Sequence, residues 1–165
     1  MLFRSNRQET LYIDEEGFLT ITGRKKEIFK TSFGKYIAPM LIENKFKESN
    51  FIDQIFVTGE NQKFAAALII PDFTYLKYWC EYKQIPYTTN EEMIAMPRIK
   101  KRFLKELNKF NSYFGETEQI KKFELLDKEW SIESGELTAT LKLRRTFISN
   151  KYSQIIKGLF NSSEE

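Results

Sequence analysis

The sequence predicts an α+β fold, in which a small β-sheet is covered by three or four helices and preceded by a β-hairpin. Short apolar or alternating segments are typical of strands, and apolar residues at helical spacing are typical of amphipathic helices. The two kinds of segment are mixed along the chain, which is typical of α+β domains. With 165 residues, of which 41% are hydrophobic, the chain can bury a core of its own.

The hairpin is predicted over residues 12–23. A stretch with a period of two follows Gly17, and glycine readily adopts the positive φ that a tight turn requires. Residues 1–11 are polar and unpatterned, so we expect a disordered or vector-derived end there. The predicted domain therefore covers residues 12–160, and residues 161–165 form a short tail.

A short strand, a loop and a helix follow the hairpin. The strand resumes over 28–30, and residues 31–36 are expected to be a loop with Gly34 at its tip. Pro39 can begin a helix because the N–H that it lacks would have no partner in the first turn anyway. The helix is predicted over 39–49.

Two strands with continuous apolar runs form the centre of the predicted sheet. They cover 52–57 and 64–70, on either side of a turn at 59–62. Their continuous apolar character predicts burial on both faces. Asp72 is a favourable N-cap for the next helix, which is predicted to extend to about Lys83.

The C-terminal half begins with an amphipathic helix at Pro97 and continues with a strand over 120–126 and a last helix over 144–158. Gly158 is expected to end that helix. Apolar residues recur at helical spacing in the first of these helices: Ile99, Phe103, Leu107 and Phe110.

The composition excludes several kinds of chemistry. The chain has no histidine, which rules out an imidazole base, a Ser-His-Asp triad and histidine zinc sites. Its single cysteine, Cys80, cannot form an intrachain disulfide, which fits a reducing cytoplasm. A net charge of +3 is too small to indicate nucleic-acid binding, and the apolar run 64–70 is too short to span a bilayer. We expect a cytoplasmic domain without a metal site of its own.

Three segments could carry function. The basic helix 98–109 could bind an anionic membrane or nucleic acid, although its apolar stripe equally fits an ordinary solvent-exposed face. The basic segment 23–28 and the glycine loop 31–34 could hold a phosphate or a ribose, or simply form turns. The polar loop 134–145 contains Lys142, which could reach a phosphate, although most lysines in such loops only face solvent.

Taken together, these segments resemble the C-terminal domain of the acyl-adenylate-forming enzymes, in particular the long-chain fatty-acid–CoA ligase branch. The resemblance extends from about Tyr12 to Phe160. It rests on three stretches of sequence: Asp14-Glu15-Glu16-Gly17-Phe18-Leu19 with Gly23-Arg24-Lys25-Lys26-Glu27; Gly34 with Ile37-Ala38-Pro39 and Ile42-Glu43; and Gly135-Glu136-Leu137-Thr138-Ala139-Thr140-Leu141-Lys142.

The resemblance implies a role for four residues. Arg24 corresponds to the residue that hydrogen-bonds the ribose of ATP, and Lys26 corresponds to the hinge about which this domain swings between half-reactions. Lys142 corresponds to the catalytic lysine that bridges the substrate carboxylate and the α-phosphate. Gly34 lies in the loop that the family brings to the pantetheine of CoA.

The resemblance also implies partners and cofactors. The substrates are a fatty acid, ATP and CoA, and Mg²⁺ is held by a large N-terminal adenylation domain outside these residues. The chain departs from the family pattern in two places. Residues 7–11 lack the upstream aspartate that binds ribose, and Ala139 replaces a proline. Without the N-terminal domain, we expect the chain to be inactive, with peripheral membrane contact as an additional expectation. The alternative is a freestanding basic module that binds nucleic acid or an anionic membrane.

Overall fold

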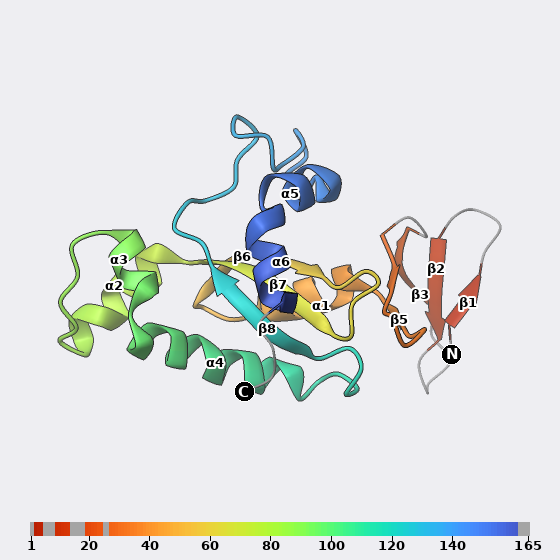
Figure 1. The fold of residues 1–165 in the computed structure, drawn as a ribbon, viewed down its shortest axis with the longest axis horizontal. Helices are drawn as coiled ribbons and strands as arrows, with labels where there is room; N and C mark the ends of the chain where they lie inside the picture. The colour runs from red at the N-terminus through yellow and green to blue at the C-terminus, as the bar shows by residue number, and fades with distance from the viewer. Residues whose placement is uncertain (1, 5–8, 14–18, 25–26, 162–165) are drawn as a thin grey trace.

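The computed structural model describes residues 2–4, 9–13, 19–24 and 27–161, and it describes side chains from residue 27 onward. Figure 1 shows the arrangement of the elements. In chain order they are β1 (Leu2–Arg4), β2 (Glu9–Ile13), β3 (Leu19–Arg24), β4 (Phe29–Lys30), β5 (Tyr36–Ile37), α1 (Pro39–Phe46), β6 (Ile52–Thr58), β7 (Ala65–Pro71), α2 (Phe73–Tyr82), α3 (Asn90–Ala95), α4 (Pro97–Asn111), β8 (Ile120–Leu125), α5 (Arg145–Lys151) and α6 (Ser153–Asn161).

The N-terminal strands form an antiparallel sheet in the order β1-β2-β3. The pairing of β2 with β3 confirms the predicted hairpin, although its turn lies outside the described residues. For residues 1–11 the prediction is a disordered or vector-derived end, and the strands in the described part of that segment contradict disorder there. There β1 pairs with β2, with Leu2 opposite Tyr12 and Arg4 opposite Thr10. Backbone pairing to the open edge of a hairpin requires no apolar pattern, so no side-chain spacing indicated this strand.

The central sheet has the order β6-β7-β8. Strand β6 pairs antiparallel with β7, and β7 pairs parallel with β8. Every residue of β7 is buried, which confirms the prediction of burial on both faces for this strand. The same prediction is wrong for the start of β6, where Asp53 is exposed and Gln54 is half-buried, because β6 is an edge strand of the sheet. Helix α6 crosses in front of this sheet in Figure 1, and α1 lies behind it. On the α1 side, Phe46 of α1 and Phe110 of α4 bring their ring centroids within 5.5 Å.

Helices α1, α2 and α4 lie where the sequence predicts them, although α1 ends at Phe46 and not at residue 49. Pro39 is the first residue of α1, and the Asp72 side chain accepts a hydrogen bond from the Tyr75 N–H at 2.9 Å at the start of α2. The predicted apolar stripe of α4 is buried along its length: Ile99, Phe103, Leu107 and Phe110. No helix within the described ranges is long and apolar enough to cross a membrane.

The predicted fold class is confirmed, with two differences in the helices. The short helix α3 was not predicted; the Thr89 side chain caps it by accepting a hydrogen bond from the Glu92 N–H. The single helix predicted over 144–158 is divided at Tyr152, which separates α5 from α6. Gly158 lies inside α6 instead of ending it.

Candidate functional site

Lys142 lies on a small, internally bonded hairpin between β8 and α5. Leu137 and Leu143 form an isolated antiparallel bridge at its base. Within the hairpin, the Thr138 N–H donates to the Lys142 carbonyl at 2.9 Å, and the Lys142 N–H donates back to Thr138 Oγ1 at 3.1 Å. Leu141 has a φ of 60° and donates its N–H to the Thr138 carbonyl at 2.8 Å. The Lys142 side chain is therefore exposed on a loop whose backbone is held in one shape.

The base of this hairpin is joined to the following helix. The Arg144 N–H donates to the Glu136 carbonyl at 2.7 Å, and Arg144 Nη1 donates to the Gly135 carbonyl at 3.1 Å. Gly135 has a φ of 95°, and a Cβ at this position would lie 2.7 Å from Phe147 Cζ of α5. Both features require glycine, because a side chain there would be strained and would also collide with the Phe147 ring.

A buried ion pair joins α5 to α1 and β6. Arg145 Nη1 contacts both carboxylate oxygens of Glu43, at 2.9 and 3.1 Å, and Arg145 Nη2 donates to the Val57 carbonyl at 2.6 Å. Glu43 also accepts the Val57 N–H at 2.8 Å. Burial raises the pKa of Glu43, and the nearby Arg145 guanidinium opposes that rise. The pair therefore fixes the first turn of α5, directly after the Lys142 hairpin.

Gly34 lies at the tip of the loop between β4 and β5, as the sequence predicts. Its φ is 79°, in the region that favours glycine, and its N–H donates to the Thr31 carbonyl at 2.9 Å. The Ser32 N–H donates to the Gln62 carbonyl at 2.9 Å, which links this loop to the turn before β7. Beside Gly34, the ring of Phe33 is 71% exposed. An exposed glycine next to an open aromatic ring leaves room for a ligand to approach the backbone.

Arg24 is the last residue of β3, opposite Glu9 in the register of the N-terminal sheet. The Arg24 side chain lies outside the described part of the chain. Lys26 lies outside it altogether. Figure 1 places the Lys142 hairpin in the light-blue loop before α5, and the loop of Gly34 beside the N-terminal strands. Gly34 and Lys142 thus lie on separate loops, and neither residue lines either of the grooves beside β8.

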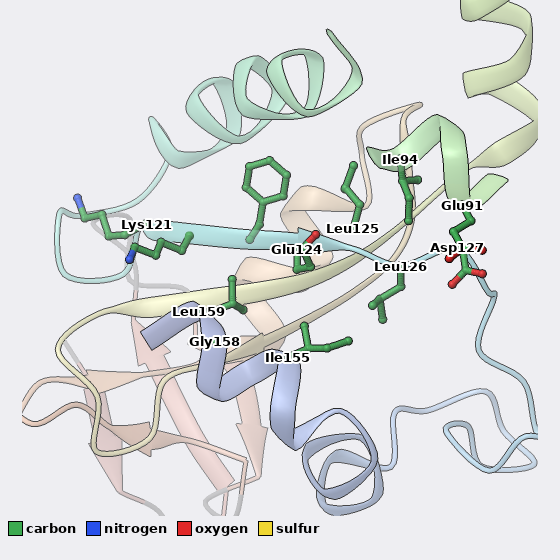
Figure 2. A pocket seen from close by; sticks show the side chains of 12 residues that line it. Glu91, Ile94, Lys121, Glu124, Leu125, Leu126, Asp127, Ile155, Gly158 and Leu159 are labelled. Carbon is green, nitrogen blue, oxygen red and sulfur yellow. The ribbon is translucent and has the colours of Figure 1, made fainter. Parts of the chain in front are cut away.

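A groove lies elsewhere, between α3, β8 and α6 (Figure 2). It has a volume of about 860 Å³, and none of the four predicted site residues lines it. Apolar side chains from three elements line its middle, including Ile94, Leu125 and Leu159, while Glu91 and Asp127 lie at one end. Within the ranges given above, no three His, Cys, Asp or Glu side chains gather as a set of metal ligands.

Residues 26–164 match the family model described as the AMP-binding enzyme C-terminal domain. The chain belongs to this family. As an AMP-binding C-terminal domain, it fits the expectation drawn from the three stretches of sequence. A freestanding basic module has no support from this match.

Curated relatives of this AMP-binding domain are long-chain-fatty-acid–CoA ligases. The chain is 31% identical over 150 residues to the ligase FadD15 of Mycobacterium tuberculosis, covering 90% of this chain and 25% of that protein. It is 36% identical over 152 residues to ligase 5 of Rattus norvegicus, covering 90% of this chain and 22% of that protein. It is 34% identical over 149 residues to ligase 1 of Homo sapiens, covering 88% of this chain and 21% of that protein. The chain thus spans about a quarter of the length of these relatives.

Solved structures share the fold of this domain. The adenylation domain of a carboxylic acid reductase from Segniliparus rugosus, in complex with AMP and a co-purified carboxylic acid, superposes with a TM-score of 0.71 at 18% identity. The match covers 93% of this chain and 22% of the reductase chain. The adenylation domain of a carboxylate reductase from Mycobacterium chelonae superposes with a TM-score of 0.69 at 19% identity. The match covers 93% of this chain and 22% of that chain.

Sequence reasoning missed two of the residues that shape the Lys142 hairpin. The partners of Glu136 and Arg145 are distant along the chain, at Lys151 and Glu43, so no local spacing pointed to them. Glu43 and Glu136 did stand within the stretches that carry the family resemblance. Each stands next to an apolar residue, Ile42 or Leu137, and an acidic residue needs a partner if its side chain is buried. Their types were therefore a weak signal.

Proposed function

We propose that this chain is the C-terminal domain of an ATP-dependent long-chain fatty-acid–CoA ligase, which adenylates a fatty acid and then transfers the acyl group to CoA. The observation that carries the proposal is the placement of Lys142. Its side chain is exposed on a hairpin held by its own hydrogen bonds, in a family whose curated relatives are such ligases. Its activity requires an N-terminal adenylation domain, which supplies the fatty-acid pocket.

In the first half-reaction, a carboxylate oxygen attacks the α-phosphorus of ATP and pyrophosphate leaves. Negative charge accumulates around the α-phosphate as the new P–O bond forms. The Lys142 ammonium would offset this charge where it develops, and a positioned cation is worth more there than in water. A lysine is suited to this task because its charge is compact and its side chain can reach across a domain interface. Arg24 would hold the ribose of the same nucleotide.

In the second half-reaction, the sulfur of CoA attacks the acyl carbonyl of the adenylate, the thiol proton is lost and AMP leaves. Lys142 has no role in this step, so the domain can turn it away. Lys26 follows the end of β3, and a turn at the end of an element can take up a large change of φ and ψ. Gly34 would then lie beside the pantetheine, where the lack of a side chain allows close approach.

Mg²⁺ would be held by the N-terminal domain, where it would neutralise phosphate oxygens of ATP. The residues of this chain supply positioning and positive charge instead.

The protein would work in the cytoplasm with peripheral contact to an anionic membrane. Support comes from the outer face of α4, where Arg98, Lys101, Lys105 and Lys109 are exposed. Among the described residues, no carboxylate forms an ion pair with any of these four. Figure 1 places α4 on the side away from the Lys142 hairpin. Flotation with anionic and neutral vesicles tests this contact, and equal binding to both would contradict it.

The two half-reactions test the proposed function when they are measured separately in the full-length enzyme. Lys142→Ala should slow acyl-adenylate formation by roughly 10²–10³-fold, the scale of losing one positioned donor. Thioester formation from preformed acyl-adenylate and CoA should change little, as should ATP binding. Lys128→Ala removes another exposed lysine and serves as the matched control. Equal losses in both half-reactions would show that Lys142 is structural, and a wild-type enzyme that adenylates no fatty acid would contradict the function itself.

A further inference from the structure

Glu136 is a buried carboxylate that has no part in the mechanism above. It lies at the base of the Lys142 hairpin and is only 1% exposed. Its Oε1 accepts hydrogen bonds from Lys151 Nζ at 2.6 Å and from the Tyr152 hydroxyl at 3.0 Å, and its Oε2 accepts one from the Ser134 hydroxyl. Both carboxylate oxygens are therefore used, and the donors come from the hairpin's own loop and from the junction of α5 and α6.

The junction is itself joined to the central sheet. The Tyr152 hydroxyl accepts a hydrogen bond from Trp130 Nε1 at 3.2 Å. The Trp130 backbone pairs twice with the Gln54 side chain of β6: its N–H donates to Oε1 at 2.7 Å, and its carbonyl accepts from Nε2 at 3.1 Å. A continuous set of hydrogen bonds thus runs from β6 through Trp130 and Tyr152 to Glu136.

Glu136 transmits this connection to the hairpin through its own backbone. Its carbonyl accepts the Arg144 N–H at 2.7 Å, which closes the hairpin base, and Leu137 begins the short bridge that contains Lys142. The side chain of Glu136 therefore joins the base of the hairpin to the junction of α5 and α6. Among the described residues, no other hydrogen bond or ion pair joins hairpin residues 138–142 to a helix or to the sheet, so their direction depends on this base.

We infer that Glu136 is a positioning residue for adenylation, which acts through the hairpin to hold the Lys142 ammonium in the place where the α-phosphate charge develops. The inference rests on the proposed function. A carboxylate suits this role because charge-assisted hydrogen bonds are short and strongly directional. Burial opposes the ionised form, but hydrogen bonds from Lys151, Ser134 and Tyr152 outweigh it and lower the pKa of Glu136 to about 2. Glu136 stays charged throughout the working pH range.

The test is a double-mutant cycle in the full-length enzyme with Glu136→Gln, Lys142→Ala and the combined variant. Glu136→Gln keeps the shape of the side chain but removes its charge. We expect a loss of about 10–100-fold in the rate of adenylation, the scale of a misplaced catalytic group, with thioester formation changed less than about twofold. In the Lys142→Ala background, Glu136→Gln should cause no further loss, because the group that it positions is already gone.

Two outcomes would overturn the inference. Losses that multiply in the combined variant would show that Glu136 does not act through Lys142, and equal losses in both half-reactions would show a general structural role. Tyr152→Phe removes one donor to Glu136 while keeping the ring, and it decides the same question if Glu136→Gln does not fold. Glu48→Gln, at an exposed salt bridge with Lys45 that involves no residue of the hairpin, should leave both rates unchanged. The wild-type and Lys142→Ala rates show separately whether the proposed function holds.

Discussion

Glu43 and Glu136 are both nearly inaccessible to solvent, yet their pKa values move in opposite directions. The pKa of Glu43 is raised because burial outweighs its contacts with Arg145 and Val57. Burial would also raise the pKa of Glu136, but the hydrogen bonds from Lys151, Ser134 and Tyr152 lower it to about 2. The pKa of the same residue type is thus shifted in opposite directions, depending on whether the groups directed at the carboxylate outweigh the cost of burial.

This difference predicts how the stability of the chain depends on pH. The pKa of Glu136 is lower in the folded state than its ordinary value of 4.5, so its contribution is complete above pH 4.5 and is lost as the pH falls toward 2. The loss should be on the order of 3 kcal/mol in the free energy of unfolding. Urea unfolding between pH 2 and pH 6 measures it.

Glu136→Gln is the comparison that isolates this contribution. Because the pKa of Glu43 is raised, protonation of Glu43 in acid favours the folded state and partly offsets the loss in both proteins. The difference between wild type and Glu136→Gln should therefore shrink as the pH falls. A difference that stays constant across the range would contradict the lowered pKa of Glu136.

At the scale of elements, α5 is held from both ends by side chains that lie outside it. Its first residue, Arg145, pairs with Glu43 of α1 and the Val57 carbonyl of β6. Its last residue, Lys151, pairs with Glu136 of the preceding loop. The helix ends at Tyr152, whose hydroxyl contacts Glu136 and Trp130. The separation of α5 from α6 therefore coincides with the contacts that fix the Lys142 hairpin.

Removal of the α1 carboxylate should show how much this arrangement stabilises the domain. Glu43→Ala leaves the Arg145 guanidinium and the Val57 N–H without their acceptor in a buried setting. We expect a loss of about 3 kcal/mol or more in the free energy of unfolding, the scale for breaking a buried pair. Denaturant unfolding measures it.

Glu48→Ala is the matched control on the same segment of chain. It breaks the exposed pair between Lys45 and Glu48 and should change stability little, because solvent screens such pairs. If the two variants were equally stable, the Glu43–Arg145 pair would have no special structural role.

At the scale of the whole molecule, the core and the predicted site residues lie apart. The core surrounds β7, which is buried along its length, and the Lys142 and Gly34 loops lie at the surface. A domain that supplies positioned charge needs its own rigid core, whereas the substrate pocket can belong to another domain. The chain spans about a quarter of its relatives' length, which agrees with that division.

The 165-residue chain should therefore fold but not catalyse. Its core is sufficient for a cooperative transition, so circular dichroism should show a single sigmoidal thermal melt. The proposed fatty-acid pocket is not part of this chain, so fatty-acid-dependent release of pyrophosphate should be absent. Turnover by the purified chain, at a rate that disappears with Lys142→Ala, would show that the pocket lies within these residues.

The sequence by itself determined the elements whose burial follows a local period. The spacing of Ile99, Phe103, Leu107 and Phe110 reports one buried helix face, and the continuous apolar run of β7 reports burial on two faces. A local pattern also located Lys142, since three stretches of sequence together resemble the family. For the roles of Arg24, Lys26, Gly34 and Lys142, the resemblance remains the source of the prediction.

Only the tertiary structure decided the contacts between distant segments. The pairing of β1 with β2 uses backbone groups that any residue carries, so no side-chain pattern reveals it. Arg145 and Glu43 meet across 102 positions, and Glu136 reaches Lys151 across 15. Periodicity reports which face of an element is buried, but not which other element covers it. The orientation of the Lys142 hairpin depends on such contacts. The sequence therefore predicted Lys142 itself but not the residues that hold its hairpin in place.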